Sequence, residues 1–360
     1  MPSMRKDLTL FGGYHSPQVE VDVRLNTNES PLGPSIEFLS DLQAAIQSLS
    51  LNRYPDRTAA RLREALAALH DVSPDEIFIA NGSNEVISTL LLAYGGPGRK
   101  AMTFEPTYAM YAQVAKVTST EHVGIERGLD FTLDLAAVLD ANIKYRPDIV
   151  FFCSPNNPTG LDEDPEIISK LAEDSNPLII IDEAYGQFAS FSALKLARSH
   201  SNIVVSNTFS KVWSMAGLRL GYLIGPKEII DNLWATCLPY HIDSIKQAAG
   251  LLALGHLDAM QATHDLILAG RNQIETGFDA LDVIYWKSSA NFILFRAPHG
   301  KGDELWKMLV DGSVLVRNCS GWPRLSDCLR VTVGTPQEND RFLKVLSEAL
   351  VELRSEVDPR

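Results

Sequence analysis

The chain has 360 residues, of which 45% are hydrophobic, so it is long enough for two domains or one large one. Its formal net charge of −13 argues against a nucleic-acid partner, because binding a phosphate backbone needs a basic face. We find no run of about 18 apolar residues that would indicate a membrane span, and no apolar segment of a secretory signal at the start. The four cysteines lack the spacing of a metal site, which favours reduced thiols in a cytoplasmic protein without a bound metal.

The first half of the chain predicts an arm followed by an α/β domain. Gly and Pro interrupt residues 1–30, which we expect to be an irregular N-terminal arm. A strand is predicted over 76–80 and a helix over 85–94. The runs 148–153, 178–182 and 202–206 are short, apolar and β-branched, which is typical of strands buried on both faces of a mostly parallel sheet with helical crossovers.

The pattern changes after about residue 250. Long helical patterns there alternate with the strand-like runs 290–296 and 328–333, which predicts a smaller α+β domain. We therefore expect an arm over 1–30, a large domain over 31–250 and a small domain over 251–360.

Polar motifs follow the three buried strands of the large domain. They are Ser154-Pro-Asn-Asn-Pro-Thr-Gly160, the stretch from Asp182 in Ile181-Asp-Glu-Ala-Tyr185, and the stretch from Thr208 in Ser206-Asn-Thr-Phe-Ser-Lys-Val-Trp-Ser-Met-Ala-Gly-Leu-Arg-Leu-Gly221. In open α/β sheets, ligands bind beyond the carboxyl ends of the strands. The sequence therefore predicts one site that gathers these motifs.

The lysine of the third motif is the candidate catalytic residue. Lys211 directly follows the hydroxyl residue Ser210 and precedes Arg219 by eight positions. A lysine amine becomes nucleophilic at neutral pH when burial or a neighbouring cation lowers its pKa, and Arg219 would supply such a cation. The alternative is a solvated surface lysine near a strand end.

Together, the three motifs resemble those of the fold-type I aminotransferases, which use pyridoxal 5′-phosphate (PLP). The resemblance implies a large domain with a mostly parallel seven-stranded sheet and a smaller α+β domain. It implies that Lys211 bonds to the aldehyde of the cofactor. It also implies that Asp182 contacts the pyridine nitrogen, which keeps the ring an electron sink, and that Tyr185 and Asn157 contact the ring O3′. The alternatives are a helix N-cap for Asp182, core packing for Tyr185 and a plain turn for Asn157.

The cofactor phosphate would lie at the start of the helix that follows Asn81-Gly-Ser-Asn84. Free N–H groups at a helix start bind phosphate, which makes Ser83 and Asn84 candidates. Thr208, Ser210 and Arg219 would close the other side of the phosphate. Tyr108 would stack on the pyridine ring. The alternatives are an N-cap role for Ser83 and core packing for Tyr108.

Within this family, the chain is most similar to the histidinol-phosphate aminotransferases, from Leu25 to about Asp340. The segments Leu25-Asn-Thr-Asn-Glu-Ser-Pro-Leu-Gly-Pro34, Leu51-Asn-Arg-Tyr-Pro-Asp56 and Leu329-Arg-Val-Thr-Val-Gly-Thr335 carry this likeness. It implies a homodimer in which Tyr54 reaches into the partner subunit's site. It also implies that Arg330 holds the acid group of the substrate, that Arg317 contacts its phosphate end, and that Tyr14 joins them. The alternative for both arginines is a surface ion pair.

The implied reaction is transamination of L-histidinol phosphate with 2-oxoglutarate. Arginine suits both substrates, because its planar guanidinium binds carboxylate and phosphate bidentately. Three residues depart from the family pattern, namely Trp322 and Arg324 near the predicted substrate loop and His241 in Pro239-Tyr-His241. Each is expected to affect which side chain the pocket accepts. An aromatic amino-acid aminotransferase and a threonine-phosphate decarboxylase are the alternatives, and a PLP-binding regulator without catalysis is an alternative of another class.

Overall fold

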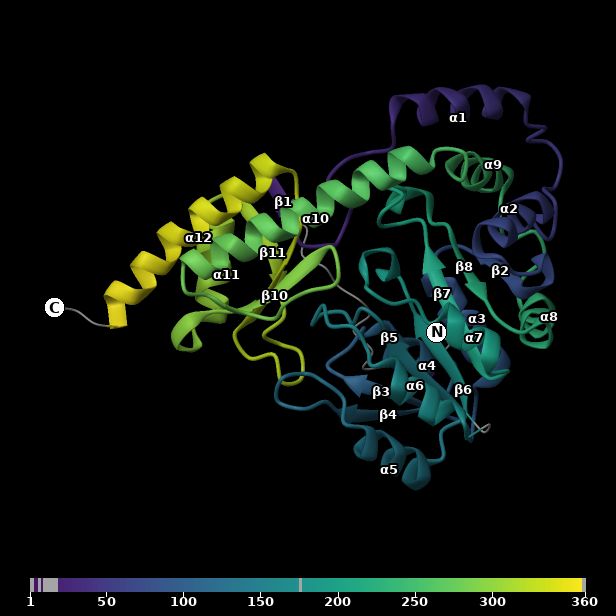
Figure 1. Ribbon diagram of the computed structural model, residues 1–360, viewed down its shortest axis with the longest axis horizontal. Coiled ribbons are helices and arrows are strands. Elements are labelled where there is room, and N and C mark those ends of the chain that lie inside the picture. Colours follow the sequence, from purple (N-terminus) through teal and green to yellow (C-terminus); the bar gives the residue numbers. More distant parts are fainter. Residues whose placement is uncertain (1–2, 6–7, 9–18, 175–176, 358–360) are drawn as a thin grey trace.

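The computed structural model describes residues 3–5, 8, 19–174 and 177–357, which contain two sheets (Figure 1). The larger sheet has the strand order β2-β8-β7-β6-β5-β3-β4. Its strands are β2 (Ile77–Ala80), β3 (Lys100–Glu105), β4 (Glu121–Glu126), β5 (Ile149–Cys153), β6 (Leu178–Asp182), β7 (Ile203–Thr208) and β8 (Gly221–Ile224). The strand β8 runs opposite to the other six, which share one direction, so the prediction of a mostly parallel seven-stranded sheet is confirmed.

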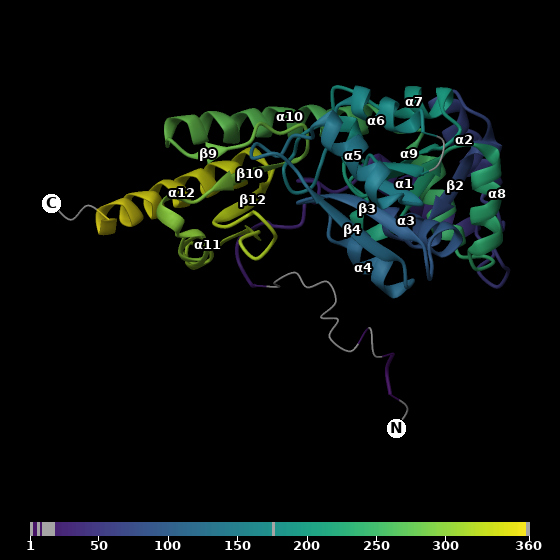
Figure 2. The same cartoon turned by 90° about the horizontal axis from the view of Figure 1, so that it is seen from below.

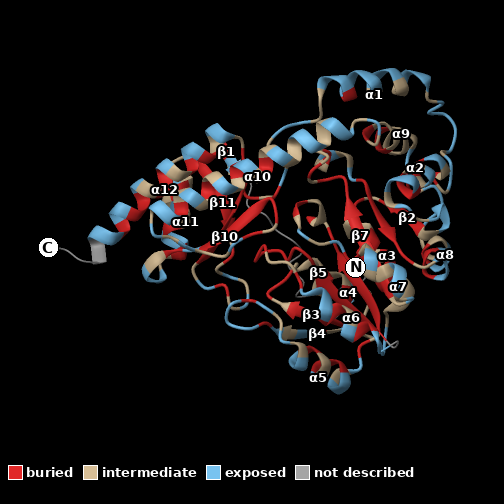
Figure 3. Cartoon of the chain, in the orientation of Figure 1, coloured by how far each residue is buried: buried red, intermediate tan, exposed pale blue. Residues whose placement is uncertain are grey.

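Helices cover both faces of the larger sheet. The helices α3 (Ser83–Tyr94), α4 (Met110–Val117) and α8 (Lys227–Thr236) pack on one face, and α5 (Leu135–Tyr145), α6 (Pro165–Ala172) and α7 (Leu194–Ser199) on the other. Because both faces are covered, the central strands are continuous apolar runs, and Figure 3 shows them as buried. A third apolar cluster joins α1 (Ile36–Ser48), α2 (Ala60–His70) and α9 (Ser244–Ala253) to the edge formed by β2 and β8.

The smaller sheet lies at one end of the molecule with its helices (Figures 1 and 2). Its strand order is β1-β11-β12-β10-β9, with β1 (Val23–Leu25), β9 (Ile284–Tyr285), β10 (Phe292–Arg296), β11 (Val314–Asn318) and β12 (Cys328–Thr332). The helices α10 (Leu257–Ala280), α11 (Gly302–Asp311) and α12 (Pro336–Val357) share an apolar core with this sheet. No helix in the described part of the chain is long and apolar enough to cross a membrane.

The strand β1 corrects the prediction for the N-terminal arm. Val23–Leu25 pairs in parallel with β11, so this part of the expected irregular arm is a strand of the smaller sheet. The cause is a long-range pairing in which the apolar Val23 and Leu25 are buried against the small-domain core. The boundaries at residues 30 and 250 stay a proposal.

A buried ion pair supports the loops beside the larger sheet. The Arg127 guanidinium donates to the Glu163 carboxylate, and each side chain is at most 3% exposed. Burial raises the pKa of Glu163, while Arg127 opposes that change. Arg127 also donates from Nε to the Phe104 carbonyl at 2.9 Å and from Nη1 to the Phe131 carbonyl at 3.2 Å. The pair thus joins the chain after β4 to the segment before α6.

Glu163→Ala is expected to destabilise the protein strongly, because it leaves the Arg127 charge buried without its carboxylate. The expected loss in the free energy of unfolding is roughly 3–5 kcal/mol. Urea unfolding at pH 7 measures it. The control is Lys170→Ala, which breaks the exposed Lys170–Glu173 pair and should leave the unfolding midpoint unchanged. Equal shifts in both variants would contradict the structural role of the buried pair.

Candidate active site

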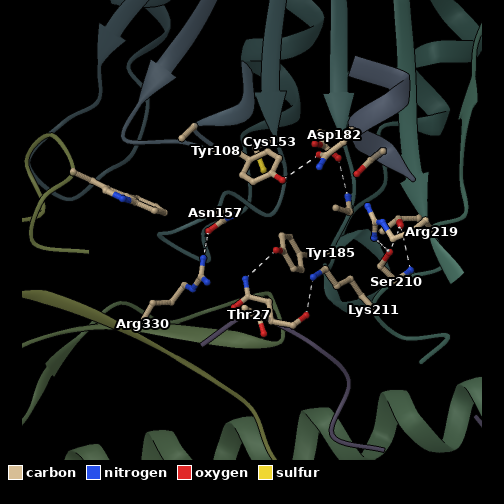
Figure 4. Close-up of a pocket in the computed structure, with 17 residues that line it drawn as sticks. Thr27, Tyr108, Cys153, Asn157, Asp182, Tyr185, Ser210, Lys211, Arg219 and Arg330 are labelled. Carbon is tan, nitrogen blue, oxygen red and sulfur yellow. Dashed lines mark hydrogen bonds between the residues drawn. The ribbon is translucent and has the colours of Figure 1, made fainter. Parts of the chain in front are cut away.

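A cavity lies at the carboxyl ends of β5, β6 and β7 (Figure 4). It is the place where the sequence motifs were predicted to meet. The predicted residues that line it are Ser83, Asn84, Tyr108, Asn157, Asp182, Tyr185, Thr208, Ser210, Lys211, Arg219 and Arg330. The prediction that these motifs share one site is therefore in agreement with the geometry.

The Lys211 amine lies inside this cavity. Its Nζ donates to the Asn28 carbonyl at 2.7 Å and lies 5.3 Å from the centre of the Tyr185 ring. Burial, followed by the positive charges of Arg330 and Arg219, lowers the pKa of this amine to about 7. The alternative of a solvated surface lysine is wrong, and a large share of the amine is neutral near pH 7.

The Asp182 carboxylate is buried at the end of β6. Its Oδ2 accepts from the Tyr111 hydroxyl at 2.8 Å, and its Oδ1 accepts from the Ala184 N–H at 3.2 Å. Burial raises the pKa of Asp182 to about 6, and these two hydrogen bonds and Lys211 oppose the rise. Asp182 caps no helix, so the N-cap alternative is wrong. Sequence reasoning missed Tyr111, because no local pattern indicates that α4 brings its hydroxyl to Asp182.

The start of α3 faces the cavity with free backbone donors. Gly82 is its N-cap, so the alternative that Ser83 is the cap is wrong. The N–H groups of Ser83 and Asn84 have no hydrogen-bond partner among the described residues. A Cβ at Gly82 would lie 2.7 Å from Arg219 Nη2, and one at Gly221 would lie 2.8 Å from the Ser83 nitrogen. The two glycines therefore let the guanidinium and β8 approach the helix start closely.

Hydroxyl groups and a guanidinium complete this set of donors. Arg219 Nη1 donates to the Ser210 hydroxyl at 3.2 Å, and the Ser210 N–H donates to Thr208 Oγ1 at 3.1 Å. On the helix side, the Tyr108 hydroxyl donates to Asn84 Oδ1 at 3.1 Å. Backbone N–H groups at a helix start, together with hydroxyls and an arginine, are suited to a phosphate.

The opposite side of the cavity joins the two sheets. Arg330 on β12 donates to Asn157 Oδ1 and to the Asn26 carbonyl, the latter at 3.0 Å. Its buried Nε has no hydrogen-bond partner in the described chain. The Asn28 amide donates to the Tyr185 hydroxyl at 2.9 Å, and burial raises the pKa of that hydroxyl. Sequence reasoning missed Asn28, although it lies in the quoted segment 25–34.

Two of the predicted substrate residues, Arg317 and Tyr54, do not line the cavity. Arg317 pairs with Arg330 across the strands β11 and β12, but its guanidinium lies against the Trp322 ring, 5.6 Å from the ring centre. Tyr54 is 82% exposed and stacks on Tyr240 with 4.6 Å between ring centres. Tyr14 lies outside the described residues. Their roles stay proposals.

The three departures from the family pattern have different surroundings. Trp322 lines the cavity, and Arg324 donates to the carbonyls of Arg127 and Gly128. His241 is packed between Phe78 and Trp234 and forms a 2.9 Å hydrogen bond with the Ile79 carbonyl through Nε2. The expectation that His241 shapes the pocket is wrong, because its ring fills a gap beside β2 instead of lining the cavity.

A family model, curated relatives and solved structures all relate the chain to aminotransferases. Residues 20–346 match the family model of class I and II aminotransferases. The chain is 40% identical to the histidinol-phosphate aminotransferase of Frankia casuarinae, covering 96% of this chain and 90% of that one. It is 39% identical to that of Corynebacterium efficiens, with 96% and 94% covered. In fold, it resembles the histidinol-phosphate aminotransferase of Sinorhizobium meliloti in complex with pyridoxal-5′-phosphate, with a TM-score of 0.85, 22% identity and 93% and 92% covered.

The lowered pKa predicts the pH dependence of Lys211 acylation in cofactor-free protein. The rate of its reaction with acetic anhydride should be half-maximal near pH 7, whereas Lys227, whose pKa Asp231 raises, should react half-maximally above pH 10. Peptide mass spectrometry measures both lysines in one sample. Lys211 loses its proton near pH 7 in the folded protein but only near pH 10.5 in the unfolded chain. The contribution of Lys211 to the free energy of unfolding should therefore rise between pH 7 and 10.5. A Lys211 midpoint above pH 9 would contradict the account.

Proposed function

Because the chain belongs to the class I and II aminotransferases, we propose that it transfers the amino group of L-histidinol phosphate to 2-oxoglutarate. The products are imidazole-acetol phosphate and glutamate, and the reaction is a step of histidine biosynthesis. The names of the relatives at about 40% identity support this donor. The observation that carries the reaction type is the Lys211 amine, with its lowered pKa, in one cavity with Asp182 and a set of phosphate donors.

The residues of the cavity fit pyridoxal 5′-phosphate. The free N–H groups at the start of α3 and the hydroxyls near Arg219 suit its phosphate. Gly82 lets the Arg219 guanidinium lie close to the start of α3, and Gly221 lets β8 do the same. The Asp182 carboxylate suits a protonated pyridine nitrogen. The residues proposed to hold the cofactor are Ser83, Asn84, Tyr108, Asn157, Asp182, Tyr185, Thr208, Ser210, Lys211 and Arg219.

When bound, this cofactor supplies an electron sink for the negative charge at the Cα of the donor. Lys211 would hold the cofactor at its aldehyde, and its amine is proposed to accept and return the Cα proton of the donor. An amine with a pKa near 7 suits both directions of this proton transfer at neutral pH. Asp182, with a pKa near 6, is mostly ionised at neutral pH and stabilises a positive ring nitrogen. Glutamate and 2-oxoglutarate use the same groups, which gives ping-pong kinetics.

Arginines are proposed to bind the acid groups of both substrates. Arg330 lines the cavity on the side away from the phosphate donors, and its buried Nε has no hydrogen-bond partner in the described chain, so the guanidinium can still donate. A carboxylate or phosphate takes two parallel hydrogen bonds from such a group. Arg317 and Tyr14 are proposed to contact the phosphate end of histidinol phosphate.

A second copy of the chain is proposed to complete the site. Tyr54 is 82% exposed, although it stacks on a neighbouring ring, and the nearby Leu238 is 78% exposed. Exposed aromatic and aliphatic side chains of this kind are typical of a covered interface. We propose a cytoplasmic homodimer in which Tyr54 reaches the partner subunit's cavity.

Replacing Lys211 should remove the reaction, whereas replacing Arg330 should mainly weaken substrate capture. For Lys211→Ala, loss of the proton-transferring amine is expected to lower kcat by roughly 10²–10⁴-fold or more. For Arg330→Ala, KM for the donor and for 2-oxoglutarate should rise with a smaller change in kcat. Glutamate formation measures both variants, with Lys227→Ala as a surface control. Ordinary turnover in Lys211→Ala would contradict the mechanism.

The donor is tested by comparing kcat/KM for L-histidinol phosphate, L-phenylalanine and L-threonine phosphate with 2-oxoglutarate as acceptor. The proposal predicts the highest value, by at least about tenfold, for histidinol phosphate, because only this donor offers both a phosphate and a ring. An equal value for phenylalanine would indicate an aromatic aminotransferase. Release of carbon dioxide from threonine phosphate would indicate a decarboxylase.

A further inference from the structure

Trp322 is the one residue of the loop 319–327 that lines the cavity. This loop joins β11 to β12, the two strands that carry Arg317 and Arg330. The indole therefore shares a cavity with Lys211, while its backbone lies in a loop between two strands of the smaller sheet. Neither the reaction mechanism nor the proposed cofactor contacts uses this side chain.

The loop holds Trp322 in a defined position. Its backbone N–H donates to the Cys319 carbonyl at 2.9 Å, and its carbonyl accepts from the Leu325 N–H at 3.2 Å. The indole packs against a buried apolar cluster that contains Phe131 and Leu325. Because the turn and the cluster fix the side chain before any ligand binds, packing against it costs little conformational entropy.

Arg324 connects this loop to the large domain. Its two Nη atoms donate to the carbonyls of Arg127 and Gly128, which follow β4. Arg127 is itself held by the buried pair with Glu163. The contact therefore ties the loop that carries Trp322 to the segment of the large domain that the buried Arg127–Glu163 pair holds.

The guanidinium of Arg317 lies against the same indole. Its Cζ is 5.6 Å from the ring centre, within the range of a cation–π contact. Arg317 does not line the cavity, whereas Trp322 does. The surface that a substrate meets on this side is therefore an aromatic ring, with a cation beside it.

We propose that Trp322 is a specificity-determining residue whose indole packs against the aromatic ring of the amino donor, with Arg324 as the residue that positions it. The inference rests on the proposed transaminase function, but it requires only that the donor carries a ring. An imidazole or phenyl ring gains contact with the indole, and glutamate, which has no ring, gains none. Aromatic pairs of this kind change affinity by roughly 2- to 12-fold.

The test measures binding of two unreactive ligands to the cofactor-loaded protein by calorimetry. One is 3-(imidazol-4-yl)propyl phosphate, which lacks the amino group of histidinol phosphate, and the other is n-propyl phosphate, which also lacks the ring. The ratio of their dissociation constants isolates the contribution of the ring. Wild-type protein should bind the ring-bearing ligand roughly 5- to 10-fold more tightly.

Four variants test whether Trp322 contacts the ring of the ligand or only supports the fold. Trp322→Ala should reduce the ratio to about 2 or less, Trp322→Phe should keep most of it, and Arg324→Ala should reduce it partly. The matched control is Trp286→Ala. Trp286 packs against the same apolar cluster and lies 5.3 Å from the Arg296 guanidinium, but does not line the cavity, so its loss should leave the ratio unchanged.

Two results would overturn the inference. One is a wild-type ratio near 1, and the other is a ratio in Trp322→Ala equal to that of the wild type or of Trp286→Ala. The proposed function fails in a different way, namely through absence of transamination with every donor while the ligand pair still reports on Trp322. If Trp322→Ala does not fold, the wild-type ratio and Trp322→Phe still decide the question.

Discussion

The site depends on keeping an amine with a low pKa inside a cavity that also contains cations. Burial is the main cause of the lowered Lys211 pKa, and the charges of Arg330 and Arg219 add to it. Asp182 opposes that effect, and burial makes the carboxylate itself a weaker acid. An exposed lysine could not serve in this way, because water would keep it protonated at neutral pH.

This arrangement requires that the two sheets stay fixed relative to each other. Asp182 ends β6 and Lys211 follows β7 of the larger sheet, whereas Arg330 lies on β12 of the smaller one. Asn28 links them, since its carbonyl accepts from Lys211, its amide donates to Tyr185, and its N–H donates to the Thr332 hydroxyl on β12 at 2.9 Å. The pKa of the amine is therefore a property of the packing between the sheets.

The loop from Ser154 to Gly160 is the second connection. Asn157 accepts from Arg330, and the Gly160 carbonyl accepts from the Ser289 N–H of the small domain at 2.7 Å. At Gly160, with φ +77°, a Cβ would lie 2.3 Å from the Ser288 hydroxyl, so a larger residue would separate the two parts. Arg324 also links the two parts, because it lies in the loop between β11 and β12 and donates to the carbonyls of Arg127 and Gly128.

The sequence predicts the local parts of this site and misses the long-range ones. Apolar β-branched runs predict the central strands, and the position of Asp182 and Lys211 after such strands follows from the parallel sheet. The strand β1 could not be predicted, because Val23 pairs with Val314, far along the chain.

Long-range packing also decides the roles of single residues. Tyr111 reaches Asp182 through the packing of α4 on the sheet, which no local pattern indicates. His241 follows a motif-like segment, yet packing places it beside Phe78.

The most direct test of the account is to locate the covalent bond between the cofactor and the chain. The protein is loaded with pyridoxal 5′-phosphate and reduced with borohydride, and its peptides are mapped by mass spectrometry. We predict a single pyridoxyl group on the peptide that contains Lys211, and none in Lys211→Ala. A group on another lysine, or none on the wild-type chain, would contradict the assignment of this cavity as the active site.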